Sequence, residues 1–455
     1  MKFSRIMLIR FIVKNFLSFK EETEFNLLPG RGTRFNHHKY DVGGIPILKL
    51  SAIYGANGSG KSNLIKAIST LRSIVILGEI PSLLLNQKFK LTQSLIDEPI
   101  DFGIEFYCKQ SCYFYSTSIN QKGEIIHEYL AETNASKEKL IFHRTFDGQT
   151  ASIKFFDGFD RKQENIILKK LIETDLIKSN QVLLSFLNKI SNEEFDNIKD
   201  VHEWFEKGLT IIGPQTKATT LPHEIDSNSA FRKFSNETMS SFNTGINEIK
   251  TQTIALSEII GKDNQKEIEN IKNKFIANPE RISVWENKIT GERHLLVYQN
   301  EDVFAKKMLF HHKGEKNENI VFDFTEESDG TKRLWELLPA FFLPINFSQT
   351  IIVDEIERSI HPLIIKELIS KFSHDENTKG QLIFSTHESN LLDQDIFRAD
   401  EIWFAEKGSN GATRLYSLND FKEHNTIDIR KGYLSGRYGG IPFLGNLHDL
   451  NWDKE

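Results

Sequence analysis

The sequence is poor in cysteine: only Cys108 and Cys112 occur among 455 residues. Two thiols cannot complete the four-ligand set of a structural zinc site. They also cannot build the disulfide framework that holds small secreted domains together. The scarcity of cysteine therefore excludes a disulfide scaffold and favours a reducing, cytosolic setting.

The sequence also lacks a long apolar run, since no stretch reaches the ~18 residues that a membrane-spanning helix needs. The N-terminal stretch MKFSRIMLIRFIVKNFLSF is apolar in part, but Arg5, Arg10 and Lys14 interrupt it. No small-residue cleavage site follows, so a signal peptide is not expected. Side chains alternate instead, and residues 6–28 predict two strands joined by a turn.

Charge of one sign is not in large excess. The net charge is −6, so no global basic field draws the chain to nucleic acid, although a local basic surface stays open. Heptads long enough for an extended coiled-coil arm are missing, as is the Asn-Lys-x-Asp base reader of GTPases. Hydrophobic residues make up 39% and charged residues 26%, which is ordinary for a globular protein with two or three structural units.

The first third of the chain reads as strands around one helix. The apolar run LKLSAIY (48–54) predicts a strand, and a helix is expected from Lys61 to about Leu77. Alternation and aromatic residues over 99–108, 113–119 and 124–131 predict strands of an antiparallel sheet.

The later chain changes pattern twice. Apolar residues three and four positions apart predict helices over 164–190, 193–209 and 264–277. Mixed strand signals follow over 281–324. Strands then alternate with helices over 331–405, which is the pattern of a parallel α/β sheet.

Residues 54–63, YGANGSGKSN, match the phosphate-loop pattern G-x-x-x-x-G-K-[ST] in full. A strand is predicted before the loop and a helix after it, as this pattern requires. Backbone N–H groups and the helix N-terminus would surround the phosphate oxygens. Lysine would reach the β- and γ-phosphates, and serine would hold Mg²⁺. The predicted nucleotide-binding residues are Gly55, Ala56, Asn57, Gly58, Ser59, Gly60, Lys61, Ser62 and Asn63.

The stretch QTIIVDEIERSIHP (349–362) supplies acidic residues at the end of an apolar strand. Asp354 follows the predicted strand directly and is expected to hold Mg²⁺. Glu355 comes next, where a general base could activate water against the γ-phosphate.

QLIFSTHESNLLD (381–393) repeats this geometry: an apolar strand ends at Ser385, Thr386 and His387. A histidine at such a strand tip can donate a hydrogen bond to the γ-phosphate and respond to its hydrolysis. His387 is therefore the predicted γ-phosphate switch.

A second phosphate-binding helix end is predicted at FTEESDGTKRLWELL (324–338), where Ser328, Gly330 and Thr331 precede a helix. One chain rarely needs two such ends for one phosphate. A head-to-tail dimer does, because each chain then offers this end to the nucleotide held by the other.

Together, these motifs resemble the ATP-binding-cassette ATPases of the SMC and OLD kind, with Ser-x-Gly-Thr in place of the longer glycine-rich signature of transporters. IRFIVKNFLSF resembles the opening strand of that family. The stretches 399–421 and 431–447 resemble the tail of a bacterial subgroup of abortive-infection ATPases, and within it the ATPase subunit of PARIS anti-phage systems. The resemblance covers about 1–135 and 320–447.

The resemblance implies an α/β fold: a P-loop ATPase head with a mixed and parallel sheet, an antiparallel lobe and an inserted helical domain. The expected segments are 1–155 (head, with the phosphate loop), 156–280 (mainly helical lobe) and 281–455 (head, with signature, acid pair and histidine). It also implies ATP and Mg²⁺ as cofactors. Lys61, Glu355 and His387 would act in catalysis, Ser62 and Asp354 on the metal.

For function, the resemblance implies an ATP-hydrolysing switch that forms at least a homodimer. In related anti-phage systems such an ATPase holds a toxic nuclease partner and releases it when a phage protein is sensed. An SMC-like repair ATPase, or an ATPase of another defence nuclease complex of the Septu or OLD type, stays an alternative. Intrinsic nuclease activity is not expected, because the segment after His387 is short and lacks an acidic D-x-D cluster.

Three points stay open at the sequence level. Gln87 and Gln93 both precede the strand at 99–108, and neither is clearly the glutamine of the family's glutamine loop. The helical lobe is either a packed lid or a surface that grips an effector or phage protein. The tail around Arg437 either docks on a second subunit or closes the fold.

Overall fold

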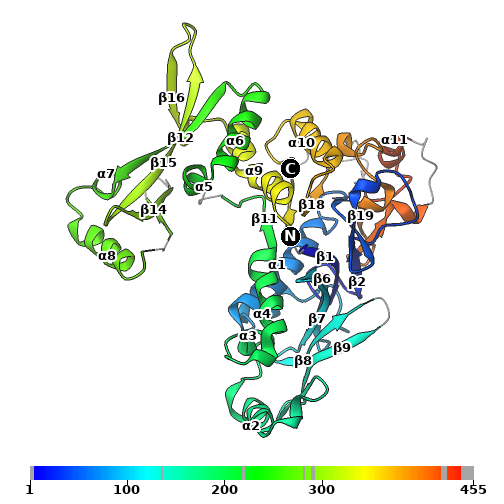
Figure 1. The fold of residues 1–455 in the computed structure, drawn as a ribbon. Helices are drawn as coiled ribbons and strands as arrows, with labels where there is room; N and C mark the ends of the chain where they lie inside the picture. The colour runs from blue at the N-terminus through cyan, green and yellow to red at the C-terminus, as the bar shows by residue number, and fades with distance from the viewer. Residues whose placement is uncertain are drawn as a thin grey trace, which may run out of the picture. The chain divides into compact units, whose positions relative to one another are not determined.

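The computed structural model describes residues 5–134, 137–217, 221–279, 282–287, 293–421 and 428–441. The chain forms two compact units (Figure 1). The first unit comprises Met1–Pro214, Leu343–Glu357 and Ile365–Glu455, and the second comprises Gln215–Phe342 and Arg358–Ile364. The three segments expected from the sequence, 1–155, 156–280 and 281–455, stay a prediction of domain organisation.

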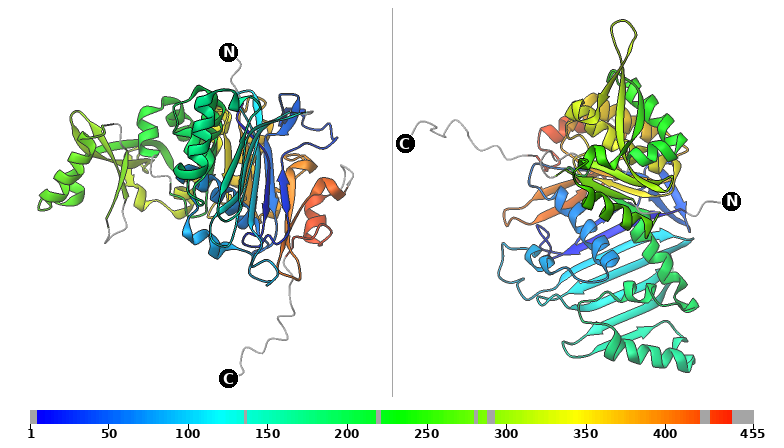
Figure 2. Two further views of the ribbon diagram at one scale, coloured as in Figure 1. Left: turned by 90° about the horizontal axis from the view of Figure 1, so that it is seen from below. Right: turned by 90° about the vertical axis from the view of Figure 1, so that its left-hand side faces the viewer.

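A seven-stranded antiparallel sheet forms one layer of the first unit, and its strands lie side by side in the right-hand view of Figure 2. The strand order is β10-β9-β8-β7-β6-β1-β2. The predicted strands at the N-terminus and over 99–131 are confirmed, whereas β9 and β10 were not predicted. The bounds are β1 Met7–Lys14, β2 Thr23–Asn26, β6 Ile100–Cys108, β7 Ser111–Ile119, β8 Ile125–Thr133, β9 Glu138–Phe146 and β10 Ala151–Phe155.

A six-stranded sheet forms the second layer, in the order β11-β17-β18-β5-β19-β20. All neighbours run parallel except β19 and β20. Every residue of β5, β17 and β18 is buried, as expected for strands covered on both faces. The bounds are β5 Leu50–Tyr54, β11 Leu209–Ile212, β17 Thr350–Val353, β18 Gln381–Thr386, β19 Ile402–Lys407 and β20 Thr413–Ser417.

One hydrophobic core joins the two layers. It contains buried residues of β1 and β6 from the antiparallel sheet, of α1, and of the parallel strands β17 and β18. The unit also contains β3 Lys39–Val42, β4 Ile45–Leu48, α1 Lys61–Leu77, α2 Gln163–Leu171, α3 Leu183–Asn188, α4 Asp196–Glu203, α11 Ile429–Leu434 and most of α10 Pro362–His374, of which residues 362–364 belong to the second unit.

A buried ion pair attaches helix α3 to the antiparallel sheet. Glu128 on β8 and Arg144 on β9 have fully buried side chains, with Nη1 and Oε2 3.6 Å apart. Glu128 also accepts hydrogen bonds from the backbone N–H groups of Leu183 (2.8 Å) and Leu184 (3.0 Å), at the start of α3. Burial raises the pKa of Glu128, and the Arg144 guanidinium acts against this rise.

The same arginine explains why the helix predicted over 164–190 is interrupted. Arg144 donates to the carbonyl groups of Gln181 (2.6 Å) and Lys178 (3.0 Å). These carbonyls lie in a turn between α2 and α3, so the predicted helix is two shorter ones. Helix periodicity could not reveal this, because Arg144 comes from a strand that was not predicted.

The second unit contains helices and a five-stranded sheet in the order β12-β15-β14-β13, with β16 also paired to β15. Strands within 281–324 were expected, but β12 was not. The helices are α5 Leu221–Ser227, α6 Ser229–Ser241, α7 Leu256–Ile260, α8 Gln265–Ile276 and α9 Asp329–Asn346, of which residues 343–346 belong to the first unit. The strands are β12 Ile246–Ala255, β13 Ser283–Glu286, β14 Arg293–Gln299, β15 Asp302–Lys313 and β16 Asn319–Asp323.

These elements confirm the predicted fold class. A phosphate loop follows a central parallel strand, an antiparallel sheet packs beside it, and a large insertion separates β11 from β17. In the described part of the chain, no helix combines the length and the apolar character needed to cross a membrane.

Candidate nucleotide-binding site

The phosphate loop connects β5 to α1, and the predicted helix over 61–77 is confirmed. Gly60 caps this helix with a left-handed backbone (φ 111°), and a Cβ at this position would collide with the side chain of Thr413. Both restrictions are met only by glycine. The loop is thus fixed by its own backbone and by a neighbouring strand.

The Lys61 side chain folds back onto the phosphate loop. Its Nζ donates to the carbonyl groups of Gly55 (2.5 Å) and Ala56 (3.1 Å), and the residue is 7% exposed. Burial lowers the pKa of Lys61, while the nearby carboxylates of Glu357, Asp354 and Glu355 act against this shift. A buried ammonium with few partners is a strong site for a phosphate anion.

Asp354 lies at the carboxyl end of β17, where two hydroxyl groups converge on one of its oxygens. Ser62 Oγ from α1 donates to Asp354 Oδ1 at 3.1 Å, and Ser385 Oγ from β18 donates at 2.5 Å. Asp354 is 5% exposed. Hydroxyl and carboxylate oxygens are the ligands that Mg²⁺ prefers, so the residues present fit such an ion.

Ser385 also positions Glu355. The Glu355 backbone N–H donates to Ser385 Oγ at 2.8 Å, so one hydroxyl contacts both members of the acid pair. Glu355 has a left-handed backbone (φ 50°), which is unfavourable for a residue with a side chain. Residues with such strained backbones are concentrated at functional sites. Sequence reasoning noted Ser385 only as part of a strand tip.

His387 follows β18 and contacts an acid that the sequence analysis passed over. His387 Nδ1 lies 2.8 Å from Oε1 of Glu357, and the His387 backbone N–H donates to the same oxygen at 2.9 Å. The His387 side chain is 55% exposed, whereas that of Glu357 is 8% exposed. The only signal for Glu357 was its position shortly after the acid pair, in DEIERSIHP.

A polar cluster supports the phosphate loop from the side. Thr413 Oγ1 donates to the Ser59 carbonyl at 2.8 Å and lies 2.7 Å from Ser18 Oγ. Asn63 Nδ2 donates to the same serine hydroxyl at 2.8 Å. Ser18 and Thr413 were not predicted, because both are distant from the loop in sequence.

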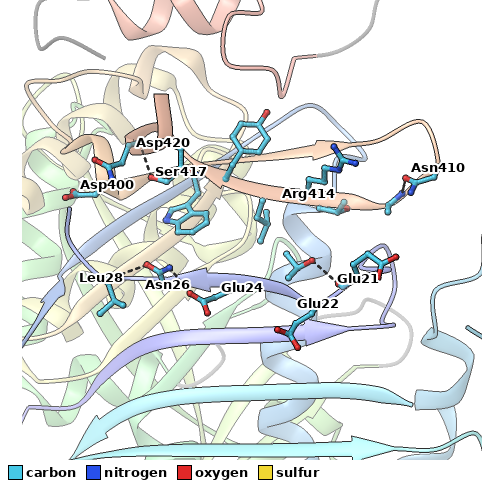
Figure 3. A pocket seen from close by; sticks show the side chains of 17 residues that line it. Glu21, Glu22, Glu24, Asn26, Leu28, Asp400, Asn410, Arg414, Ser417 and Asp420 are labelled. Atoms are coloured by element: carbon cyan, nitrogen blue, oxygen red, sulfur yellow. Dashed lines mark hydrogen bonds between the residues drawn. The ribbon is translucent and has the colours of Figure 1, made fainter. Parts of the chain in front are cut away.

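Thr413 also lines a hollow of about 770 Å³ between β2 and β20 (Figure 3). Glu22 and Glu24 stand on one side of the hollow, and Arg414 stands on the other. Some of its acids are paired, since Glu24 lies 3.5 Å from Arg10 and Asp400 lies 2.6 Å from Arg398. The lining of the hollow thus has more carboxylates than cations, and it includes Thr413, which contacts the phosphate loop.

The predicted signature residues belong to the second unit. Ser328 precedes α9, and its Oγ accepts a hydrogen bond from the Thr331 backbone N–H (3.1 Å), as an N-cap residue does. A Cβ at Gly330 would lie 2.9 Å from the Ser359 carbonyl, so this close approach requires glycine. The serine and glycine therefore shape an exposed helix N-terminus.

Gln87 and Gln93, the two candidates for the glutamine loop, both make backbone hydrogen bonds. The Gln87 carbonyl accepts from the Leu17 backbone N–H at 2.6 Å, and the Gln93 carbonyl accepts from Ile96 at 3.2 Å. Both contacts use backbone atoms, so neither side chain gains a nucleotide role.

The described part of the tail packs on its own chain. Tyr433 and Tyr438 stack on Phe404 of β19, with ring centroids 5.6 and 5.7 Å away. A Cβ at Gly440 would lie 3.7 Å from the Gly55 Cα of the phosphate loop. Residues 428–441 thus close the fold behind the loop, while residues 442–447 of the predicted tail motif lie outside the described residues.

Comparisons of structure return heads of SMC proteins, each 12% identical to this chain. The match with an Smc head bound to the C-winged helix domain of ScpA spans 92% of this chain and 100% of the Smc head chain (TM-score 0.44). An SMC head domain from Thermotoga maritima covers 90% and 98% (TM-score 0.40). A Pyrococcus furiosus Smc head with an extended coiled coil, bound to the C-terminal domain of ScpA, covers 92% and 100% (TM-score 0.39).

No curated protein matches the chain in sequence. A family profile does match, over residues 50–393, from the strand before the phosphate loop to the segment after His387. This range is more than half of the chain and includes every predicted site residue. The chain therefore belongs to the family described as "AAA domain, putative AbiEii toxin, Type IV TA system".

Proposed function

We propose that this chain is an ATP-driven molecular switch, which binds ATP with Mg²⁺ and hydrolyses it. The observation that supports this most is the contact of Ser62 and Ser385 with Asp354, which joins the phosphate loop to the acid pair. Family membership agrees with an AAA-type nucleotide site. His387 follows β18, which pairs with β5, and the acid pair follows β17, which pairs with the other edge of β18.

In the proposed mechanism, Lys61 moves from the carbonyl groups of its own loop to the β- and γ-phosphates. Ser62 and Asp354 would hold Mg²⁺, which neutralises charge on the phosphate oxygens. Glu355 accepts a proton from the attacking water as general base. His387 donates a hydrogen bond to the γ-phosphate and responds to its loss.

The second part of the proposal is a head-to-tail homodimer. Ser328, Gly330 and Thr331 form the exposed N-terminus of α9, where backbone N–H groups and the helix dipole favour an anion. We propose that this end contacts the nucleotide held by the other copy, so that two ATP molecules are clamped between two chains.

We propose a role in anti-phage defence, as an ATPase subunit like that of PARIS systems. It would sense a phage protein and hold or release a toxic nuclease encoded nearby. The family description refers to a toxin–antitoxin system, which agrees with an effector partner. Co-purification with the product of the neighbouring gene tests this part.

Glu355→Gln tests the switch itself. This change removes the base but keeps the shape, so the variant should bind Mg²⁺-ATP, hydrolyse it at least about 100-fold more slowly, and accumulate as a closed dimer. Sedimentation velocity with and without Mg²⁺-ATP measures the dimer, and phosphate release measures hydrolysis. Hydrolysis at the wild-type rate would show that Glu355 is not the base.

A further inference from the structure

Glu357 is a buried carboxylate that the proposed mechanism does not use. It lies in the first unit, and its Oε1 contacts both the backbone N–H and the ring Nδ1 of His387, at 2.9 and 2.8 Å. An ionised carboxylate can only accept hydrogen bonds. Both contacts are therefore donated by His387, which assigns the ring proton to Nδ1.

This assignment determines what the other ring nitrogen can do. When Nδ1–H donates to the carboxylate, Nε2 carries the lone pair in the neutral ring. With a proton on both nitrogens, Nε2 is a second donor, while Nδ1 keeps its hydrogen bond to Glu357. Phosphate oxygens accept hydrogen bonds, so Nε2 can donate to the γ-phosphate only in the doubly protonated ring, which Glu357 holds by Nδ1.

The second oxygen of Glu357 suggests more than a structural role. Oε2 is buried and has no hydrogen-bond partner within the described residues. A buried carboxylate oxygen without a donor lowers stability, because it has lost its hydrogen bonds to water. Its charge acts on two groups of the site, since Glu357 opposes the lowered pKa of Lys61 and adds to the raised pKa of Tyr54, both caused mainly by burial.

We propose that Glu357 is a positioning residue, which keeps the Nδ1 proton of His387 in a hydrogen bond and so directs Nε2 toward the γ-phosphate of ATP. This inference rests on the proposed function for the identity of the ligand. The Glu357–His387 pair itself exists without nucleotide, so it can be tested separately.

The first experiment measures the His387 ring by ¹⁵N NMR of histidine-labelled protein without nucleotide, with His387→Gln identifying its signals. Wild-type protein should show the Nδ1–H tautomer. Glu357→Ala should lose it, whereas Glu357→Gln should largely keep it, because an amide oxygen still accepts from both donors. Glu367→Gln, an exposed change on α10, is the matched control. An unchanged tautomer in Glu357→Ala would overturn the proposal.

The second experiment measures ATP hydrolysis by the same variants. Glu357→Ala should lower kcat by about tenfold or more and change KM for ATP by less than about threefold, because His387 acts after binding. Glu357→Gln should lose less than Glu357→Ala. Equal loss in both variants, or a change in KM alone, would contradict a positioning role. If wild-type protein hydrolyses no ATP, the proposed function fails, while the tautomer measurement still decides the role of Glu357.

Discussion

Single residues order this site through contacts that cross between strands. The Ser385 hydroxyl accepts from the Glu355 backbone and donates to Asp354, so one side chain of β18 contacts both acids that follow β17. Thr413 plays a similar part for the phosphate loop, through its contact with the Ser59 carbonyl. Small hydroxyl residues thus position the charged groups.

Lys61→Ala tests the phosphate contact at this scale. Removing the ammonium should weaken ATP binding by about 100-fold, the scale of losing charge-assisted hydrogen bonds worth ~3 kcal/mol. Fluorescent-nucleotide titration measures the affinity. Lys66→Ala, an exposed lysine on the same helix, is the control and should bind normally. Equal affinity of both variants would mean that the loop does not hold the phosphates.

The residues found from sequence are those whose spacing has a chemical meaning. The phosphate loop, Asp354 and His387 were predicted because each stands at a strand end in a recognisable pattern. Ser18, Thr413 and Glu357 were missed because their roles depend on which strands lie side by side. No local pattern contains that information.

At the scale of elements, a buried charge joins helix α3 to the antiparallel sheet. Glu128 contacts Arg144 and the first N–H groups of α3, and all these atoms are inside the first unit. Such a network holds the elements together, because the loss of one partner would leave the other charge buried and unpaired, which lowers stability.

Glu128→Ala should therefore lower the free energy of unfolding by about 3–5 kcal/mol, since Arg144 would stay buried without its carboxylate. Chemical denaturation followed by circular dichroism measures the change. Glu164→Ala, an exposed change on α2, should stay within about 0.5 kcal/mol of wild type. A loss of less than 1 kcal/mol in Glu128→Ala would show that the pair contributes little.

Elements were predictable where the pattern was strong and local. Helix α1 begins and ends as expected, because a phosphate loop precedes it and Gly78 caps it. Strands β11 and β12 were missed: β11 begins at Leu209, the last residue of the helix predicted over 193–209, and its other residues were not assigned. Both strands are defined by pairing with distant partners, β11 with β17 and β12 with β15, and no local pattern shows such pairing.

At the scale of the whole molecule, the proposed function requires a nucleotide that is shared by two chains. The phosphate loop and acid pair belong to the first unit, and the signature turn belongs to the second. Ser328→Arg should block the turn with a bulky cation and abolish hydrolysis, while ATP binding to the loop stays nearly intact. Lys61→Ala should also abolish hydrolysis, but for the opposite reason: it keeps the signature turn and loses the lysine that holds the phosphates.

The most direct measurement mixes these two inactive variants in equal amounts and follows ATP hydrolysis. In a mixed dimer, the loop of Ser328→Arg would face the intact turn of Lys61→Ala and form one complete site. Random pairing then predicts up to about a quarter of the wild-type rate, whereas each variant alone gives almost none. A mixture as inactive as its components would contradict the account.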